Sequence, residues 1–577
     1  MDDPNSQNNN SAVSPSNYRN IVPYIEAQSP EIVIQPETFQ LVVPQVLPKT
    51  QEPIVLCPYQ EPHVKKLNEI FQTSYVGLDF SKTGRGKTYT ASALATYYKY
   101  PIILIAPRTL FSVWKEMETK HGVIIENKIS YALLRGIHGK KCNHPYLTRT
   151  SNDGYLATPY LISRIDEGRL FVFDEMSKLK NQTSQSRKAA HAIIKTIVSR
   201  KSSSRVLLLS ALPTNEPIHV LTLMQLLGII YVDNFVEYDK SGRTYHLTGI
   251  QEVIDWCYKR NPDKTREIIN QHSTTSRQSI MEMSTELYYY IISDHLSSCM
   301  VVDNPVDLDI KNGYYPIDSE NLAILKQGQR ILNDAIRYRG DQLVNPRTIN
   351  WGMITRGIKL LGKAKLKIMA QMARVFLISN PSSKGVICVW FVSHIKWLAE
   401  ALKGYGVETL YGKTKMKQRK PVVDRFQDPD SDCRIIIINP TVGGMGISLD
   451  DRDGNHPRWM LLMPDYRIMD LVQCTGRVNR KSTLSKEETI IRFVYTKAFK
   501  TESRILSSLH RKSEAARIVI SDRSGIRLPD SYHIDNQIEV LPEFSTPLPP
   551  LPDPEEVLDE GFVLPDSLDN NLSLLRI

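Results

Sequence analysis

The chain has no apolar run as long as a membrane-spanning helix, which needs about 18 or more consecutive apolar residues. Hydrophobic residues make up 41% of its 577 positions and are distributed along the whole length. The first residues, MDDPNSQNNNSAVSPSN, are polar and begin acidic, so the sequence predicts neither a secretory signal nor a transit peptide. These absences favour a soluble globular protein, and its length indicates roughly two to four domains.

Cysteine is scarce as well. Seven cysteines are scattered along the chain, and no two of them form a C-x-x-C pair. This pattern is typical of a reducing compartment and argues against a structural zinc site. We therefore expect an intracellular protein of the cytoplasm or nucleus, or of a virion if the source is a virus, with no zinc and no membrane partner.

Acidic residues are in deficit over most of the chain. The net charge is +10, but residues 1–50 carry −3 and residues 541–577 carry −7, which leaves +20 on residues 51–540. A surplus of this size favours a polyanionic partner such as nucleic acid. Charge alone leaves one alternative open, a lysine-rich surface without such a partner.

One stretch carries specific chemistry, the residues SKTGRGKT at positions 81–88. They follow the apolar run YVGLDF (75–80), which is typical of a strand, and precede the helix-forming run ASALA (91–95). A strand, a glycine-rich turn and a helix in this order predict a phosphate-binding loop. The loop begins with Ser81, where the usual pattern has glycine.

The residue types in and before this loop suit a nucleotide. Gly84 and Gly86 permit backbone conformations that point successive N–H groups at one anion. We expect Lys87 to reach the β- and γ-phosphates and Thr88 to hold Mg²⁺ through its hydroxyl. Gln60, ahead of the loop, has an amide that can both donate to and accept from an adenine edge.

Two further apolar runs predict strands that end in polar residues. The run RLFVFDE (169–175) ends in Asp174 and Glu175, about 90 residues after the loop. Because chemistry in parallel sheets lies outside the carboxyl ends of the strands, we expect Asp174 to hold the magnesium shell and Glu175 to polarise the attacking water. The run RVLLLSA (205–211) continues into LPTNE, whose hydroxyl can sense the γ-phosphate; an ordinary strand-to-helix turn is the open alternative.

A second alternation of strands and helices begins near residue 350, after a polar stretch that has only helical patches. Its glycine cluster NPTVGGMG (439–446), which includes Gly446, indicates a close approach of the backbone to another group. Further on, QCTGRVNR (473–480) places Arg477 and Arg480 three residues apart, on one face if the segment is helical. These arginines could reach a nucleotide that the first alternation holds.

The order of these motifs resembles that of superfamily-two helicases, and within them the Snf-type DNA-dependent ATPases. The matching segments are LCPYQ (56–60), SKTGRGKT (81–88), IAPRTLFSVWKEM (105–117), VFDEMSKLKN (172–181), LLLSALPTNEP (207–217), NPTVGGMGISL (439–449) and QCTGRVNR (473–480). The chain departs from the family in its acidic box, Asp-Glu-Met-Ser rather than Asp-Glu-Ala-His, and in Ser-Ala-Leu-Pro rather than Thr-Gly-Thr-Pro. Its compact size looks more like the ATPases of large DNA viruses, some of which act in transcription termination.

The resemblance implies an α/β fold of two RecA-like parallel-sheet lobes in tandem, with a mostly helical insertion between them and disordered termini. We accordingly expect five regions. They are a disordered N-terminal arm (1–50), a RecA-like helicase ATP-binding lobe (51–228), a helical insertion and inter-lobe connection (229–345), a RecA-like helicase C-terminal lobe (346–523) and an acidic, proline-rich tail (524–577).

The resemblance also implies that ATP and Mg²⁺ bind between the lobes and that hydrolysis moves the protein along nucleic acid, most simply duplex DNA. The residues expected to be catalytic are Lys87, Asp174, Glu175, Gln473, Arg477 and Arg480. Those expected to bind the nucleotide are Gln60, Ser81, Lys82, Thr83, Gly84, Arg85, Gly86, Lys87, Thr88 and Gly446, and those expected to bind the metal are Thr88 and Asp174.

Three functions remain compatible with the sequence. The first is a Snf-type translocase on duplex DNA, which in a virus could work with an RNA polymerase or other transcription components. The second is a helicase that separates DNA or RNA strands. The third is a non-catalytic binding protein or virion structural component with a relic ATPase site, which the intact set of expected catalytic residues argues against.

Overall fold

The computed structural model describes most of the chain between its two ends. The described residues are 51–136, 142–151, 154–211, 214, 219–238, 245–300, 306–335, 338–339, 342–343, 351–443, 447–465, 467–496, 509, 541–542, 544 and 547–552. The predicted N-terminal arm and most of the predicted tail lie outside these residues. Among the described helices, none is long and apolar enough to cross a membrane.

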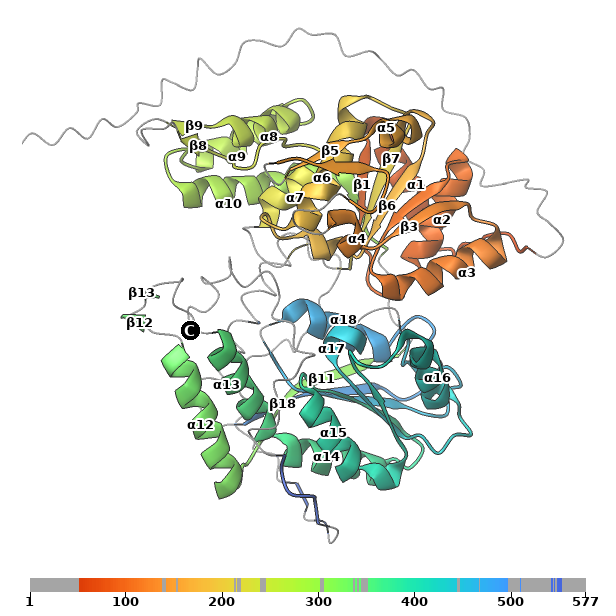
Figure 1. Ribbon diagram of the computed structural model, residues 1–577, viewed down its shortest axis with the longest axis vertical. Coiled ribbons are helices and arrows are strands. Elements are labelled where there is room, and N and C mark those ends of the chain that lie inside the picture. The colour runs from red at the N-terminus through yellow and green to blue at the C-terminus, as the bar shows by residue number, and fades with distance from the viewer. Residues whose placement is uncertain are drawn as a thin grey trace, which may run out of the picture. The chain divides into compact units, whose positions relative to one another are not determined.

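The first half of the chain folds around a six-stranded sheet whose neighbouring strands are all parallel. Helices flank this sheet on both sides (Figure 1). In order across the sheet the strands are β10 (Ser297–Ser298), β1 (Val76–Asp79), β7 (Arg205–Leu209), β6 (Leu170–Asp174), β2 (Ile102–Ile105) and β3 (Ile125–Ile129). The main helices are α1 (Glu61–Thr73), α2 (Lys87–Tyr98), α3 (Phe111–His121), α4 (Tyr131–Arg135), α5 (Pro159–Asp166), α6 (Gln185–Ser199) and α7 (Val220–Leu226).

The central strands are short apolar runs rather than alternating ones. Strands β1, β2 and β6 are buried at every position, as expected for a parallel sheet covered on both faces. Their carboxyl ends lie at one edge of the sheet because all neighbouring pairs are parallel. That edge carries the phosphate loop after β1 and the two carboxylates at the end of β6.

The second half of the chain forms another six-stranded sheet with parallel neighbours throughout. In order its strands are β11 (Leu308–Tyr315), β18 (Thr489–Thr496), β17 (Arg458–Leu462), β14 (Lys384–Cys388), β16 (Ile435–Ile438) and β15 (Val407–Leu410). Its helices are α14 (Leu366–Ser379), α15 (Val392–Ala401), α16 (Met416–Gln427), α17 (Pro440–Gly443) and α18 (Ile468–Val478). Two parallel sheets in tandem confirm the predicted fold class.

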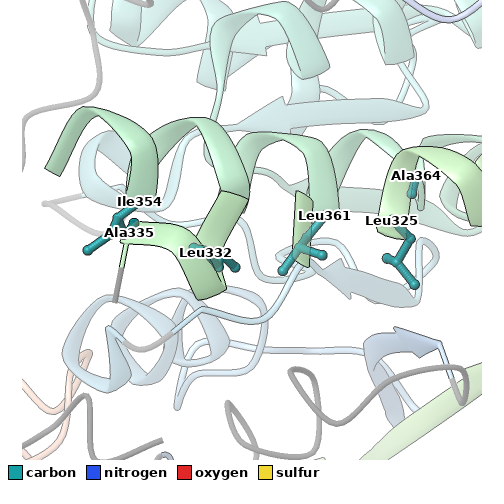
Figure 2. Packing of buried hydrophobic residues seen from close by; sticks show 6 residues of the cluster. All are labelled: Leu325, Leu332, Ala335, Ile354, Leu361 and Ala364. Carbon is teal, nitrogen blue, oxygen red and sulfur yellow. The ribbon is translucent and has the colours of Figure 1, made fainter. Parts of the chain in front are cut away.

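The stretch between the two sheets is largely helical, as predicted. It contains α8 (Thr248–Tyr258), α9 (Pro262–Gln271), α10 (Arg277–Leu287) and, after a π-helical turn at Tyr288–Ile292, α11 (Ser293–Leu296). A long helix, α12 (Ser319–Ala335), packs along α13 (Trp351–Lys363) through a cluster of six buried residues (Figure 2). The cluster comprises Leu325, Leu332, Ala335, Ile354, Leu361 and Ala364.

Glycines let α12 and α13 approach closely. A Cβ added at Gly328 would lie 3.0 Å from the carbonyl oxygen of Gly357, and one added at Gly357 would lie 2.5 Å from Leu332 Cγ. The two helices therefore pack backbone against side chain at this crossing, and a larger residue at either glycine would push them apart.

The same stretch also supplies an edge strand to each sheet, which the sequence analysis did not predict. Strand β10 pairs with β1, and β11 pairs with β18 along all eight of its residues. The segment that we expected to be only an insertion and connection thus completes both sheets. The limits that we set for the five regions remain predictions.

Part of the acidic tail lies against the second lobe. Trp397 Nε1 on α15 donates a hydrogen bond of 2.7 Å to the carbonyl oxygen of Pro550, and the Arg374 guanidinium lies 5.7 Å from the centre of the Phe544 ring. The tail's proline-rich run therefore has a definite binding place on this lobe.

Candidate nucleotide-binding site

The phosphate loop has the backbone geometry that the sequence predicted. Gly84 and Gly86 have φ values of +79° and +85°, and α2 begins directly after them at Lys87. Gly86 is also tightly enclosed, because a Cβ there would lie 2.2 Å from Gln60 Nε2. The loop thus presents a helix N-terminus and turned backbone amides, a combination that suits a phosphate group.

The lysine of the loop bends back over it. Lys87 Nζ donates to the carbonyl oxygens of Ser81 at 2.6 Å and Lys82 at 3.2 Å. The ammonium group therefore lies over the loop, where phosphate oxygens would compete with the two carbonyls for it. Thr88 follows at the first turn of α2 and is partly exposed, as a metal-binding hydroxyl at this position must be.

Gln60 makes two hydrogen bonds within the protein. Its Oε1 accepts from the backbone N–H of Cys57 at 2.8 Å, and its Nε2 donates to the carbonyl oxygen of Arg85 at 3.0 Å. The side chain, 4% exposed, joins the turn before α1 to the phosphate loop. Its predicted role toward adenine stays a prediction, and each amide atom keeps further hydrogen-bonding capacity for it.

A buried carboxylate that the sequence analysis missed supports the loop from behind. Asp79, the last residue of β1, is fully buried, and its Oδ1 accepts a hydrogen bond from the Ser81 backbone N–H at 2.9 Å. Its Oδ2 lies 3.0 Å from His63 Nε2. Burial by itself would raise the pKa of Asp79, but His63, Lys87 and the bond from Ser81 lower it below its ordinary value. A charged residue at the end of an apolar strand was the available signal.

The predicted magnesium ligand Asp174 is held by two aromatic side chains. Trp114 Nε1 donates to its Oδ2 at 2.9 Å, and the Tyr131 hydroxyl donates to its carbonyl oxygen at 2.8 Å. Burial raises the pKa of Asp174 to about 6; the adjacent Glu175 raises it too, while Trp114 and Lys87 lower it. A divalent cation would stabilise the buried Asp174 carboxylate beside the partly exposed carboxylate of Glu175.

Glu175 adopts a backbone conformation that is rare outside glycine. Its φ of 58° and ψ of 50° are left-handed, which costs about 1–2 kcal/mol for an L-residue. Its Oε1 accepts hydrogen bonds from Ser177 Oγ at 3.0 Å and from Gln473 Nε2 at 2.6 Å. Gln473 belongs to the second lobe, so the two lobes meet at the residue that we expect to polarise water.

The two predicted arginines do not share one helix face, because α18 ends at Val478 and Asn479 is extended. Arg480 lies beyond the helix, where it donates to the carbonyl oxygen of Ile447 at 2.7 Å and to Ser448 Oγ at 2.5 Å. Burial and the neighbouring Arg477 lower the pKa of Arg480 to about 9. An anion beside these two guanidinium groups would offset the cost of placing them together.

The described site residues of both lobes lie next to one another. A Cβ at Gly84 would lie 3.1 Å from Arg480 Cδ, and one at Gly476 would lie 2.4 Å from Thr83 Oγ1. Arg477, buried in α18, interacts electrostatically with Glu175. The phosphate loop, the two carboxylates and the α18 segment therefore surround one place. Gly446, also predicted to bind the nucleotide, lies outside the described residues.

The two expected metal ligands, Thr88 and Asp174, suit Mg²⁺ better than a metal ion whose ligands all come from the protein. Mg²⁺ usually keeps several water ligands and takes one or two protein oxygens. Thr88 and Asp174 offer one hydroxyl and one carboxylate. Within the described ranges, no group of three or more His, Cys, Asp or Glu side chains is arranged to hold a metal ion. All seven cysteines are free thiols.

Known proteins have sequences similar to that of this chain. Residues 365–482 match the family model of the helicase conserved C-terminal domain. The putative ATP-dependent RNA helicase L364 of Acanthamoeba polyphaga mimivirus is 22% identical over 486 residues, which cover 82% of this chain and 85% of the viral protein.

Chromatin-remodelling proteins are also similar. The mouse SWI/SNF-related matrix-associated actin-dependent regulator of chromatin subfamily A member 1 is 21% identical over 430 residues, covering 69% of this chain and 38% of the mouse protein. The SWI2/SNF2 ATPase core of Sulfolobus solfataricus, solved in complex with double-stranded DNA, covers 84% of this chain and 96% of its own at 16% identity, with a TM-score of 0.30.

The chain is similar to helicase-like ATPases, and the sequence relatives confirm the predicted resemblance to the Snf type of superfamily two. Among those relatives is a protein of a mimivirus. The chain spans most of the viral relative but well under half of the mouse protein.

Proposed function

We propose that this chain is a nucleic-acid motor that hydrolyses Mg-ATP between its two lobes and uses the resulting movement to translocate along duplex DNA. The observation that carries the proposal is the 2.6 Å hydrogen bond from Gln473 of the second lobe to Glu175 of the first. Because residues of both lobes surround one nucleotide site, the state of the nucleotide can control the separation of the lobes.

Each described residue then has a task in hydrolysis. The turned amides of the loop and Lys87 bind the phosphates and orient the terminal one. Mg²⁺, held by Thr88 and Asp174, would neutralise charge on the phosphate oxygens. Glu175 orients the attacking water, and its hydrogen bonds from Ser177 and Gln473 hold the carboxylate in place. Arg477 and Arg480 stabilise the charge that develops on the transferred phosphoryl group.

Duplex DNA is the preferred substrate in this proposal. The surplus of +20 on residues 51–540 supplies the charge for a phosphate backbone. The Snf-type relatives include chromatin remodelling and DNA repair proteins. If the source is a large DNA virus, RNA polymerase or other transcription components are the partners that we expect. The free thiols of all seven cysteines are compatible with a reducing compartment.

A helicase that separates strands is the second candidate function. It is favoured by the viral relative, which is named as an ATP-dependent RNA helicase and aligns with 82% of this chain. Both functions share the nucleotide site and differ only in what the movement does to the nucleic acid.

The experiment that tests the proposal measures ATPase rates in parallel without nucleic acid and with single-stranded DNA, duplex DNA and RNA. We expect the largest stimulation by duplex DNA, together with displacement of a third strand from a triplex and no unwinding of a plain duplex. Stimulation by RNA or single strands alone, with unwinding, would favour the second candidate. Lys87→Ala should abolish turnover with every substrate, whereas Glu175→Gln should still bind ATP.

A further inference from the structure

The short strand β10 is bonded to the phosphate loop as well as to the sheet. It pairs with β1 in the register Leu78 to Ser297 and Asp79 to Ser298, so it ends where the loop begins. Beyond it, the backbone N–H of Met300 donates to Ser81 Oγ at 2.8 Å, and the N–H of Phe80 donates to the carbonyl oxygen of Ser298 at 3.2 Å. The start of the loop is thus bonded to residues 298–300.

A histidine completes this connection. His63, on α1 and 4% exposed, has its Nδ1 2.8 Å from Ser298 Oγ and its Nε2 3.0 Å from Asp79 Oδ2. The second contact has the distance of an ion pair but not the angle of a good hydrogen bond. Nε2 is the ring nitrogen that faces the Asp79 carboxylate, and Nδ1 is the one that meets the Ser298 hydroxyl; which atom of the second pair donates depends on the tautomer.

The chain that follows β10 leads into the other sheet. Ten residues after Ser298, at Leu308, it begins β11, which pairs with β18. Ten residues of extended chain span at most about 33–36 Å, so the connection limits how far β11 can lie from β10. A displacement of β10 would reach the loop by two routes. One is direct, through the bonds to Phe80 and Ser81, and the other passes through Ser298, His63, Asp79 and the backbone N–H of Ser81.

We propose that His63 is a positioning residue of the phosphate loop, which links the loop to β10 and so couples nucleotide binding to the segment that enters the second lobe. This inference rests on the proposed function. His63 touches neither nucleotide nor metal in this role; it holds Asp79 and Ser298, and these hold the loop. A buried carboxylate is costly without partners, and His63 offers Asp79 an electrostatic one while its other ring nitrogen meets Ser298.

The test compares two serines that are adjacent in β10. Ser298→Ala removes the hydroxyl that meets His63, whereas the matched control Ser297→Ala removes a hydroxyl that donates to the carbonyl oxygen of Ser293. Both variants lose one hydrogen bond of similar strength in the same strand. Ser298→Thr keeps the hydroxyl and should behave like the unchanged protein. His63→Phe removes both contacts and is informative where it folds.

The first readout is amide hydrogen exchange of the full chain with and without Mg-ADP. We expect Mg-ADP to slow exchange both in residues 84–88 and in residues 297–300. In Ser298→Ala the response of residues 297–300 should fall about threefold or more, the scale set by one buried hydrogen bond, while residues 84–88 respond normally. Ser297→Ala should retain both responses.

The outcomes separate this inference from the proposed function. If residues 84–88 do not respond to Mg-ADP in the unchanged protein, the nucleotide site itself is wrong and the proposed function fails. If those residues respond while 297–300 do not, or if the two alanine variants behave alike, the coupling through His63 is overturned and the nucleotide site stands.

A second readout is the stimulation of ATP turnover by saturating duplex DNA. We expect Ser298→Ala to lower the ratio of stimulated to basal kcat about threefold or more, with little change in the KM for ATP. Ser298→Thr should restore the ratio. A fall in basal and stimulated rates by the same factor would indicate a merely structural role and would contradict the inference.

Discussion

At the scale of single residues, the site depends on side chains that hold the expected catalytic groups in place. The sequence indicated Asp174 and Glu175 because they end an apolar strand. It could not indicate that the Trp114 indole donates to Asp174, because that bond joins residues 60 positions apart. The carboxylate is therefore fixed by a neutral donor, which leaves its charge available to a cation.

We predict that Trp114→Phe lowers ATP turnover about tenfold at limiting Mg²⁺ and raises the Mg²⁺ concentration needed for half-maximal rate, because the indole N–H is lost while the ring's bulk stays. The measurement is kcat against MgCl₂ concentration. Trp397→Phe is the matched control, since its indole bonds to Pro550 in the other lobe. An unchanged Mg²⁺ requirement in Trp114→Phe would mean that Asp174 does not depend on this bond to hold the metal.

At the scale of elements, the second lobe contains a buried histidine that titrates far from its usual range. His394 on α15 is fully buried against α13, where a Cβ at Gly362 would lie 2.8 Å from His394 Cε1. Burial, with Lys359, Lys363 and Lys365 nearby, lowers the pKa of His394 to about 3. The folded chain therefore keeps this imidazole neutral where an unfolded chain would protonate it.

We predict that this lobe loses stability as the pH falls below the unfolded value of about 6.5. Because the unfolded state binds the proton and the folded state does not, lowering the pH from 6.5 to 5 costs up to about 2 kcal/mol from this group. Urea unfolding at both pH values measures it. His394→Leu should reduce the difference, whereas His121→Leu, a partly exposed position on α3, should not. Equal pH dependence in all three proteins would contradict the assignment.

The elements also show what periodicity can and cannot predict. The apolar runs at β2, β6, β7, β14, β16 and β17 predicted buried parallel strands, and the structure confirms them. We did not predict strands β11 (LDIKNGYY) and β3 (IENKI), because polar side chains interrupt their apolar residues. Both lie at sheet edges, where one side of a strand need not be apolar. The three-residue spacing of Arg477 and Arg480 likewise could not predict that α18 ends at Val478, before Arg480.

In the candidate site, too, local sequence patterns predicted some residues, while others depend on contacts between distant parts of the chain. Glycines with positive φ, a lysine at the helix start and carboxylates at a strand end follow local rules, so Gly84, Gly86, Lys87 and Asp174 could be placed from sequence. His63 and Ser298 could not, because their contact joins α1 and β10 across 235 positions, whereas Asp79 had a local signal that was missed. Such contacts depend on the register of the sheet, which no local pattern contains.

At the scale of the whole molecule, charge decides how the protein meets its substrate. We predict that duplex DNA affinity falls steeply with salt, because the +20 body would release counterions from the phosphates that it contacts. The measurement is the dissociation constant from about 50 to 200 mM salt, and its log–log slope should be steeper than about −2. A shallower slope would exclude a groove that follows the DNA backbone.

The central claim for the whole molecule is that two lobes share one catalytic site. Arg480, from the second lobe, lies against Gly84 of the phosphate loop. Arginines that meet the transferred phosphoryl group contribute roughly 10³–10⁵ in rate in other systems. Arg434, which donates to the Ser383 carbonyl oxygen within the second lobe, offers a matched control for the loss of a guanidinium group.

The most direct test is single-turnover ATP hydrolysis by Arg480→Ala with saturating duplex DNA. We predict a loss of about 10³-fold or more with ATP binding retained, because Lys87, Thr88 and Asp174 stay in place, and a severe loss also in Arg480→Lys, which lacks the planar fork of donors. Arg434→Ala should hydrolyse ATP near the normal rate. A loss under about tenfold in Arg480→Ala would show that the second lobe does not share the catalytic site.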